Sequence, residues 1–171
     1  MRRPKKYLFL FLITLLGNNA FSKNLTVYIF LSETCPICQS VTTELKKLHT
    51  QYLSDNIRFV GVFPDKFNSS EASRKAYAKK YGISFDLQAD SAYQLTSRFK
   101  ATITPEVVIL DNSNQTIVYR GKVDNSFASI GKRRTVITEH YLRSALQHWS
   151  EGKHDLIVNT EPVGCFIQKQ K

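Results

Sequence analysis

Two cysteines separated by two residues, Cys35 and Cys38, are the side chains of this sequence best suited to chemistry. An apolar run rich in β-branched residues precedes them at residues 25–31, and apolar residues at helical spacing follow at residues 41–53. Two thiols at such a strand-to-helix junction are typical of a redox pair. We therefore predict a redox-active disulfide between Cys35 and Cys38.

The expected start of a helix beside Cys35 favours the ionised form of its thiol. The first N–H groups of a helix lack partners within the helix and carry the positive end of its dipole, so they lower the pKa of a nearby thiol. Pro36 suits the first helical position because it needs no N–H and its φ is already helical. We predict that Cys35 attacks a substrate disulfide and that Cys38, one turn further in, resolves the mixed disulfide.

A pair with this spacing also occurs in zinc sites and in structural disulfides. Zinc would need two more ligands at a suitable spacing. The remaining candidates form no second CxxC or HxxxH motif near the pair; they are Cys165, His49, His140, His148 and His154. We therefore expect no metal and no other cofactor, and we interpret the four histidines as surface or helix-side residues.

Three motifs carry a resemblance to a known family. TCPIC at residues 34–38 is followed by ITPE at residues 103–106, directly before an apolar strand, and by VYRG at residues 118–121. The chain resembles the thioredoxin-like superfamily over residues 25–150, and within it the secreted redoxins near the alkyl hydroperoxide reductase/thiol-specific antioxidant and TlpA-like domains. The resemblance implies an α/β fold, a thioredoxin-like three-layer sandwich with a central mixed sheet and helices on both faces, and a thiol–disulfide oxidoreductase or antioxidant activity.

The resemblance also implies a substrate-binding loop. In this family the proline before the strand is cis and faces the cysteine pair, which corresponds to Pro105 here, and the backbone of Thr104 would pair with an extended substrate segment. The chain departs from thioredoxin-type motifs at Thr34, where they often place Trp, and at Ile29, where they carry a buried acid. Proton transfer to and from Cys38 must then use another group or water.

Two alternatives stand beside disulfide exchange. Ser32 lies three residues before Cys35, as a Ser or Thr does in thiol peroxidases, although the upstream proline of those enzymes is missing. A copper-binding module using Cys35, Cys38 and Cys165 is the other alternative, because Cu(I) accepts thiolate ligands. The longer cysteine spacing and the specific histidine of related copper chaperones are absent from the chain.

Residues 1–22 predict a signal peptide, followed by a domain at residues 23–151 and a tail at residues 152–171. A basic start precedes an apolar run at residues 7–16, and residues 20–22 fit the small-x-small cleavage pattern. The apolar run is well short of the roughly 20 residues that cross a bilayer. No cysteine lies near the cleavage point, which disfavours a lipoprotein. We predict export, to the bacterial periplasm, with an uncleaved anchor as the alternative.

Charge and compartment restrict the partners. The net charge of +10 falls to about +6 without the four basic residues of the signal peptide, which favours solubility or mild attraction to anionic surfaces, including a peripheral membrane position. No aromatic–basic interleaving indicates nucleic-acid binding. We expect protein or small-molecule disulfides and thiols as substrates. An exported reductant needs a supply of electrons, which in this family is commonly a membrane-embedded thiol donor.

The rest of the sequence predicts a series of short elements. They are a strand at residues 57–63, a helix from Ser69 or Ser70 to Tyr81, an extended segment at 83–90, a short helix at 93–99, a hairpin at 107–110 and 116–119, and a helix at 138–149. Residues 124–137 read as an irregular loop whose GKRR run is solvated or contacts an anionic partner.

The tail shows no clear periodicity and contains an odd cysteine, Cys165. This thiol could pair transiently with the cysteine pair, pair between chains, help to hold a metal or remain free. The number of cysteines does not decide among these roles.

Overall fold

The computed structural model describes residues 25–65, 69–153 and 158–168. The predicted signal peptide lies outside these residues. The helices are α1 (Pro36–Gln51), α2 (Glu71–Tyr81), α3 (Gln94–Arg98) and α4 (Tyr141–Ser150). The strands are β1 (Leu25–Phe30), β2 (Ile57–Phe63), β3 (Asp86–Ala89), β4 (Ile103–Thr104), β5 (Glu106–Asp111), β6 (Thr116–Gly121), β7 (Phe127–Ser129), β8 (Lys132–Arg133), β9 (Val158–Asn159) and β10 (Cys165–Phe166). None of the helices described is long and apolar enough to cross a membrane.

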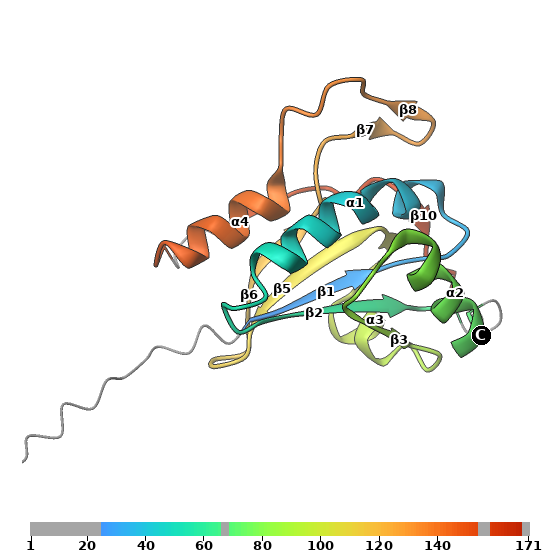
Figure 1. Cartoon of the computed structure of the whole chain (residues 1–171), viewed down its shortest axis with the longest axis horizontal. Helices are drawn as coiled ribbons and strands as arrows, with labels where there is room; N and C mark the ends of the chain where they lie inside the picture. The colour runs from blue at the N-terminus through green and yellow to red at the C-terminus, as the bar shows by residue number, and fades with distance from the viewer. Residues whose placement is uncertain (1–24, 66–68, 154–157, 169–171) are drawn as a thin grey trace, which may run out of the picture.

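A six-stranded mixed sheet in the order β3-β2-β1-β5-β6-β9 forms the middle layer (Figure 1). Strand β1 pairs in parallel with β2 and antiparallel with β5, so it lies inside the sheet. The predicted hairpin is present as β5 and β6, which pair antiparallel. Strands β1, β2 and β5 are nearly continuous in apolar residues because both faces of the sheet are covered.

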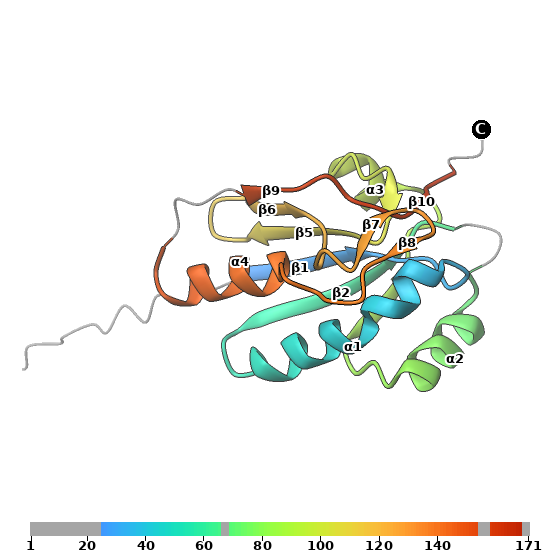
Figure 2. The same cartoon turned by 90° about the horizontal axis from the view of Figure 1, so that it is seen from above.

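The two faces of the sheet bury separate cores. Side chains alternate along β1, so Val27 and Ile29 belong to the core under α1, α2 and α4, whereas Phe30 belongs to the core under α3. Leu45 of α1 and Leu146 of α4 are fully buried in the first core. Figure 2 shows the same layers from above. This arrangement confirms the predicted three-layer sandwich with helices on both faces.

Local signals predicted some helix ends better than others. The hydroxyl of Ser70 accepts a hydrogen bond from Ser73 N at 3.0 Å, and Gly82, with φ of 64°, ends α2, so both predicted ends are correct. Helix α1 starts at Pro36, as the proline beside Cys35 predicts. It ends two residues before Leu53, the predicted end, whose side chain is exposed and gains nothing from helical packing.

Two segments without predicted structure contain short strands. The loop at residues 124–137 includes the β7–β8 hairpin, which projects above α1 in Figure 1. In the tail, β9 joins the sheet beside β6, and β10 pairs with β4. Strands of two or three residues are too short to show a hydrophobic period in the sequence. Whether such a segment forms a strand depends on the strand that lies beside it in the fold.

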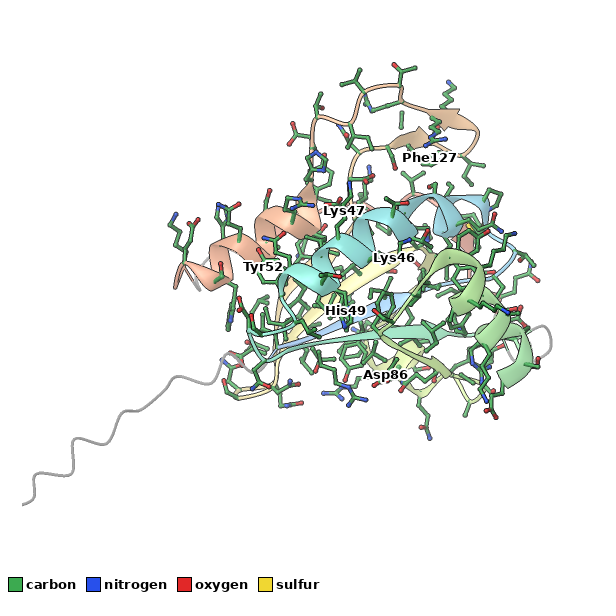
Figure 3. The ribbon with its side chains drawn as sticks, viewed as in Figure 1. Lys46, Lys47, His49, Tyr52, Asp86 and Phe127 are labelled. Atoms are coloured by element: carbon green, nitrogen blue, oxygen red, sulfur yellow. The ribbon has the colours of Figure 1, made fainter. Side chains whose placement is uncertain are left out.

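The interpretation of His49 as a surface or helix-side residue agrees with its contacts. Figure 3 shows His49 on α1 above Asp86 of β3. Its Nδ1 lies 3.1 Å from Ser84 Oγ, and its ring meets the rings of Phe59 and Phe85 edge to face. Burial lowers its pKa and the charge of Asp86 opposes that shift. The imidazole therefore fills a gap between α1 and the sheet.

Candidate active site

Cys35 lies where the chain leaves β1 and enters α1. Its backbone is extended, with φ of −80° and ψ of 116°, and it occupies the cap position before Pro36. Its carbonyl accepts a hydrogen bond from Gln39 N at 3.1 Å. The proline in the first turn leaves the N–H groups of Ile37 and Cys38 as the nearest donors to the Cys35 sulfur. The predicted position of this thiol at a helix start is therefore present.

The surroundings of Cys35 stabilise a thiolate. Its pKa falls from 9.0 to about 5, chiefly because the Cys38 thiol hydrogen-bonds to its sulfur. Burial acts in the opposite direction, while the thiol of Cys165 and the N–H groups of Cys38 and Ile37 lower the pKa further. Cys35 is consequently ionised at neutral pH.

Cys38 is held in the opposite protonation state. Its side chain is fully buried in the first core, and its sulfur accepts a hydrogen bond from Ser32 N at 3.4 Å. Burial and the adjacent Cys35 thiolate raise its pKa well above the ordinary value, so it remains a donor. Attack by Cys35 and resolution by Cys38 remain predictions. Both roles require an ionised sulfur at Cys35 beside a protonated sulfur at Cys38.

The loop before β5 faces the two cysteines. The Thr104–Pro105 bond is cis, as the resemblance implies. The carbonyl oxygen of Thr104 lies 3.4 Å from Cys35 Sγ, and Pro105 lines a small cavity together with Ile37 of α1. The structure thus brings Cys35, Cys38, Thr104 and Pro105 to one place. Binding of substrate by Thr104 remains a prediction.

Cys165, whose role the sequence left open, also lies at this place. Its Sγ is 2.8 Å from Cys35 Sγ, and it pairs with Thr104 across β10 and β4. All three cysteines are free thiols. Burial and the Cys35 thiolate raise the pKa of Cys165 to about 11. Pairing with the cysteine pair was one of the roles that the sequence left open for this odd cysteine, and the structure places its sulfur where that role is possible.

A cavity of about 300 Å³ opens beside the cysteines. Thr34, Thr104 and Cys165 are among the residues that line it, whereas Cys35 is not and is only 1% exposed. Cys165 itself is exposed. Molecules in solution therefore meet the sulfur of Cys165 more readily than that of Cys35.

Comparison with known proteins assigns the chain to a family. A family profile described as thioredoxin-like matches residues 23–117, which is more than half of the chain. The chain belongs to this thioredoxin-like family. No curated protein sequence matches it significantly.

Solved structures resemble between 61% and 87% of this chain. An uncharacterized conserved protein from Geobacillus kaustophilus is 25% identical, with a TM-score of 0.77 over 87% of this chain and 79% of that one. A hypothetical protein from Sinorhizobium meliloti is 23% identical, with a TM-score of 0.73 over 85% and 80%. A thiol-disulfide oxidoreductase from Bacteroides fragilis is 18% identical, with a TM-score of 0.50 over 61% and 76%. The last two comparisons show the shared fold.

Tyr77 of α2 is a buried polar group that sequence reasoning did not identify. Its side chain is 5% exposed, and its hydroxyl has no hydrogen-bond partner among the residues described. Burial raises its pKa, and the neighbouring groups Cys38, Tyr81 and Cys35, whose ionised forms are negative, raise it further. The hydroxyl therefore interacts electrostatically with the cysteine pair. In β1, the strand before the pair, Ile29 stands where thioredoxin-type domains often have a buried acid.

Two polar residues beside the cysteine pair, Ser32 and Glu33, hydrogen-bond to other side chains. The hydroxyl of Ser32, which a thiol peroxidase would use, lies 3.2 Å from Thr34 Oγ1. Glu33, the acid nearest to the pair in sequence, accepts hydrogen bonds from the hydroxyls of Ser69 and Ser73 at 2.9 and 3.0 Å. Within the described part of the chain, no group of three or more His, Cys, Asp or Glu side chains is placed to hold a metal ion.

Proposed function

We propose that this thioredoxin-like protein is an exported thiol–disulfide oxidoreductase with Cys35 as nucleophile and Cys38 as resolving thiol. The observation that carries the proposal is the Cys35 sulfur at the start of α1, with a pKa of about 5, hydrogen-bonded by the Cys38 thiol. A low-pKa thiolate beside a protonated thiol is the arrangement that disulfide exchange needs.

The reaction proceeds in two exchanges. The Cys35 thiolate attacks one sulfur of a substrate disulfide, the substrate S–S bond breaks, and the departing sulfur leaves as a thiolate that takes a proton. Cys38 then loses its proton and attacks the Cys35 sulfur, which releases the second substrate thiol and leaves the Cys35–Cys38 disulfide. The substrate is reduced by two electrons and the protein is oxidised by two. The reverse sequence transfers a disulfide to the substrate.

Turnover of insulin disulfides by the purified domain with dithiothreitol as reductant tests the activity. We expect the wild-type domain to accelerate the reaction and Cys35→Ser to abolish the acceleration, because no other thiolate replaces the nucleophile. Thr43→Ser, on the exposed face of α1, is a matched control and should retain the wild-type rate. Equal rates for wild type and Cys35→Ser would exclude the proposal.

Hydrogen peroxide separates the proposal from the peroxidase alternative. An oxidoreductase should exchange disulfides faster than it consumes peroxide, whereas a peroxidase should show the opposite preference with the same dependence on Cys35. A mixed disulfide trapped in Cys38→Ser would identify the physiological substrate by mass spectrometry.

Export and the electron supply belong to the same proposal. We expect the full-length chain to lose residues 1–22 on secretion and to receive electrons from a membrane-embedded thiol donor. N-terminal sequencing of the mature protein should begin at Lys23. A protein that keeps its basic N-terminus and stays with the membrane fraction would indicate an uncleaved anchor instead.

A further inference from the structure

The C-terminal tail is bound along the edge of the active-site loop. Strand β10 pairs antiparallel with β4, with Cys165 opposite Thr104 and Phe166 opposite Ile103. Ile167 N donates to the carbonyl of Thr102 at 2.8 Å, which extends the ladder by one residue. The backbone edge at Thr104, which the family resemblance assigns to an extended substrate, is therefore occupied by the chain's own residues.

Contacts on both sides of Cys165 fix this part of the tail. Thr160 N donates to Arg120 O at 2.9 Å, and Thr160 Oγ1 accepts from Lys122 N at 2.9 Å, which ties the start of the segment to β6 and the residue after it. Beyond β10, the hydroxyl of Tyr93 donates to Gln168 O at 3.2 Å. The position of the Cys165 sulfur is therefore set by backbone and side-chain bonds before and after it.

The sulfur that this strand presents lies against the nucleophile. Cys165 Sγ is 2.8 Å from Cys35 Sγ, although 130 positions separate the two residues. Cys35 is covered and Cys38 is fully buried, whereas Cys165 is exposed and lines the adjacent cavity. Cys35 thus has two neighbouring thiols, one inside the core and one toward solvent.

We propose that Cys165 is a third redox-active thiol, which forms a disulfide with Cys35 in exchange with Cys38 while the tail occupies the position of a substrate strand. The inference rests on the proposed function, since it uses the same nucleophile. It gives the protein an outer disulfide, Cys35–Cys165, beside the inner disulfide, Cys35–Cys38.

The exchange between the two disulfides balances without another reactant. In the inner form, the Cys165 thiol loses its proton and attacks the Cys35 sulfur; the Cys35–Cys38 bond breaks, and Cys38 leaves as a thiolate that takes up a proton. The protein stays at the same oxidation level throughout. An external disulfide or thiol then exchanges with the outer form, where one sulfur of the bond belongs to an exposed residue.

Oxidised glutathione tests the inference in the Cys38→Ser protein, starting from the fully reduced chain with its C-terminal tail. Attack by Cys35 forms a Cys35–glutathione mixed disulfide and releases one reduced glutathione. We expect Cys165 to displace the second glutathione, because a tethered thiol has an effective concentration on the order of millimolar or higher. The product, measured as intact mass, is then a monomer with an internal Cys35–Cys165 disulfide and no glutathione.

The matched control is Cys38→Ser combined with Cys165→Ser, which should keep its glutathione. If Cys38→Ser keeps the adduct as long as this double variant, or forms only disulfide-linked dimers, the inference is overturned. Absence of any adduct or disulfide in both variants would instead mean that Cys35 does not attack, which is a failure of the proposed function. In Cys165→Ser alone, Cys38 is present and should displace glutathione from Cys35. Loss of the adduct in this variant would show that the nucleophile and the fold are intact.

The wild-type protein offers a second measurement that does not depend on a variant. Oxidation by two electrons leaves one thiol of the three free, and alkylation followed by peptide mapping locates it. We expect the label on Cys38 in some molecules and on Cys165 in the others. A label on Cys165 in every molecule would show that the outer disulfide does not form, and would overturn the inference.

Discussion

Gly164 packs so closely against the carbonyl group of Thr104 that a Cβ at position 164 would overlap it. The atoms in the way are backbone, which cannot rotate aside as a side chain would. The glycine before Cys165 is therefore required for β10 to approach β4. Close backbone approach is one of the few roles that only glycine fills.

Gly164→Ala should loosen the tail from the active-site loop. Loss of about one backbone hydrogen bond, worth about 1 kcal/mol, would raise the population of molecules in which β10 is detached from β4 roughly fivefold. We expect alkylation of Cys35 by iodoacetamide at neutral pH to accelerate by a similar factor, because the tail covers this thiol. Gly131→Ala, where a Cβ meets nothing within 4 Å, is the control and should leave the rate unchanged. An unchanged rate in Gly164→Ala would mean that the tail does not limit access.

The pH dependence of alkylation should report the lowered pKa of Cys35. Because the pKa falls from 9.0 to about 5, the thiolate is present above pH 5 and is lost as the pH falls below it. We expect the iodoacetamide rate at Cys35 to reach half its plateau near pH 5. Cys38→Ala removes the hydrogen bond that lowers the pKa most, so the midpoint should move upward. A wild-type midpoint near 9 would contradict the assignment of the nucleophile.

The same stabilised thiolate should set the reduction potential of the pair. A thiolate that is favoured in the reduced protein makes the disulfide more oxidising. The pKa of about 5 lies between the values of about 7 for thioredoxin and about 3.5 for DsbA. We expect a potential between about −270 and about −120 mV, measured against glutathione by alkylation of free thiols. A potential outside this interval would show that the pKa of Cys35 does not set the reduction potential of the pair.

Tyr77→Phe should leave the free energy of unfolding unchanged or raise it by up to about 1 kcal/mol, because it removes a buried hydroxyl that has no partner among the described residues. Tyr119→Phe is the matched comparison. The hydroxyl of Tyr119 donates to Lys122 O and lies 3.2 Å from Thr160 Oγ1, so its loss should cost about 1 to 2 kcal/mol. Urea unfolding of reduced protein measures both. Equal losses in the two variants would show that Tyr77 has a partner, with Cys38 as the first candidate.

Local patterns were sufficient for the elements that depend on neighbouring residues. The cap at Ser70, the stop at Gly82 and the turn between β5 and β6 are decided within a few positions, so the sequence predicts them correctly. The strand-to-helix junction at Cys35 is equally local. The cis bond at Pro105 came from the resemblance, because spacing alone does not distinguish a cis from a trans bond.

By itself, the sequence determined that a pair of thiols stands at the start of a helix, since a strand pattern, the cysteines and a proline follow one another along the chain. Only the tertiary structure decided that Cys165 meets Cys35, because β10 has no period of its own and is formed by the free edge of β4. Likewise, only packing left the Tyr77 hydroxyl buried with no hydrogen-bond partner among the residues that the structure describes. Contacts between distant positions depend on how the whole sheet is assembled, and no local pattern encodes them.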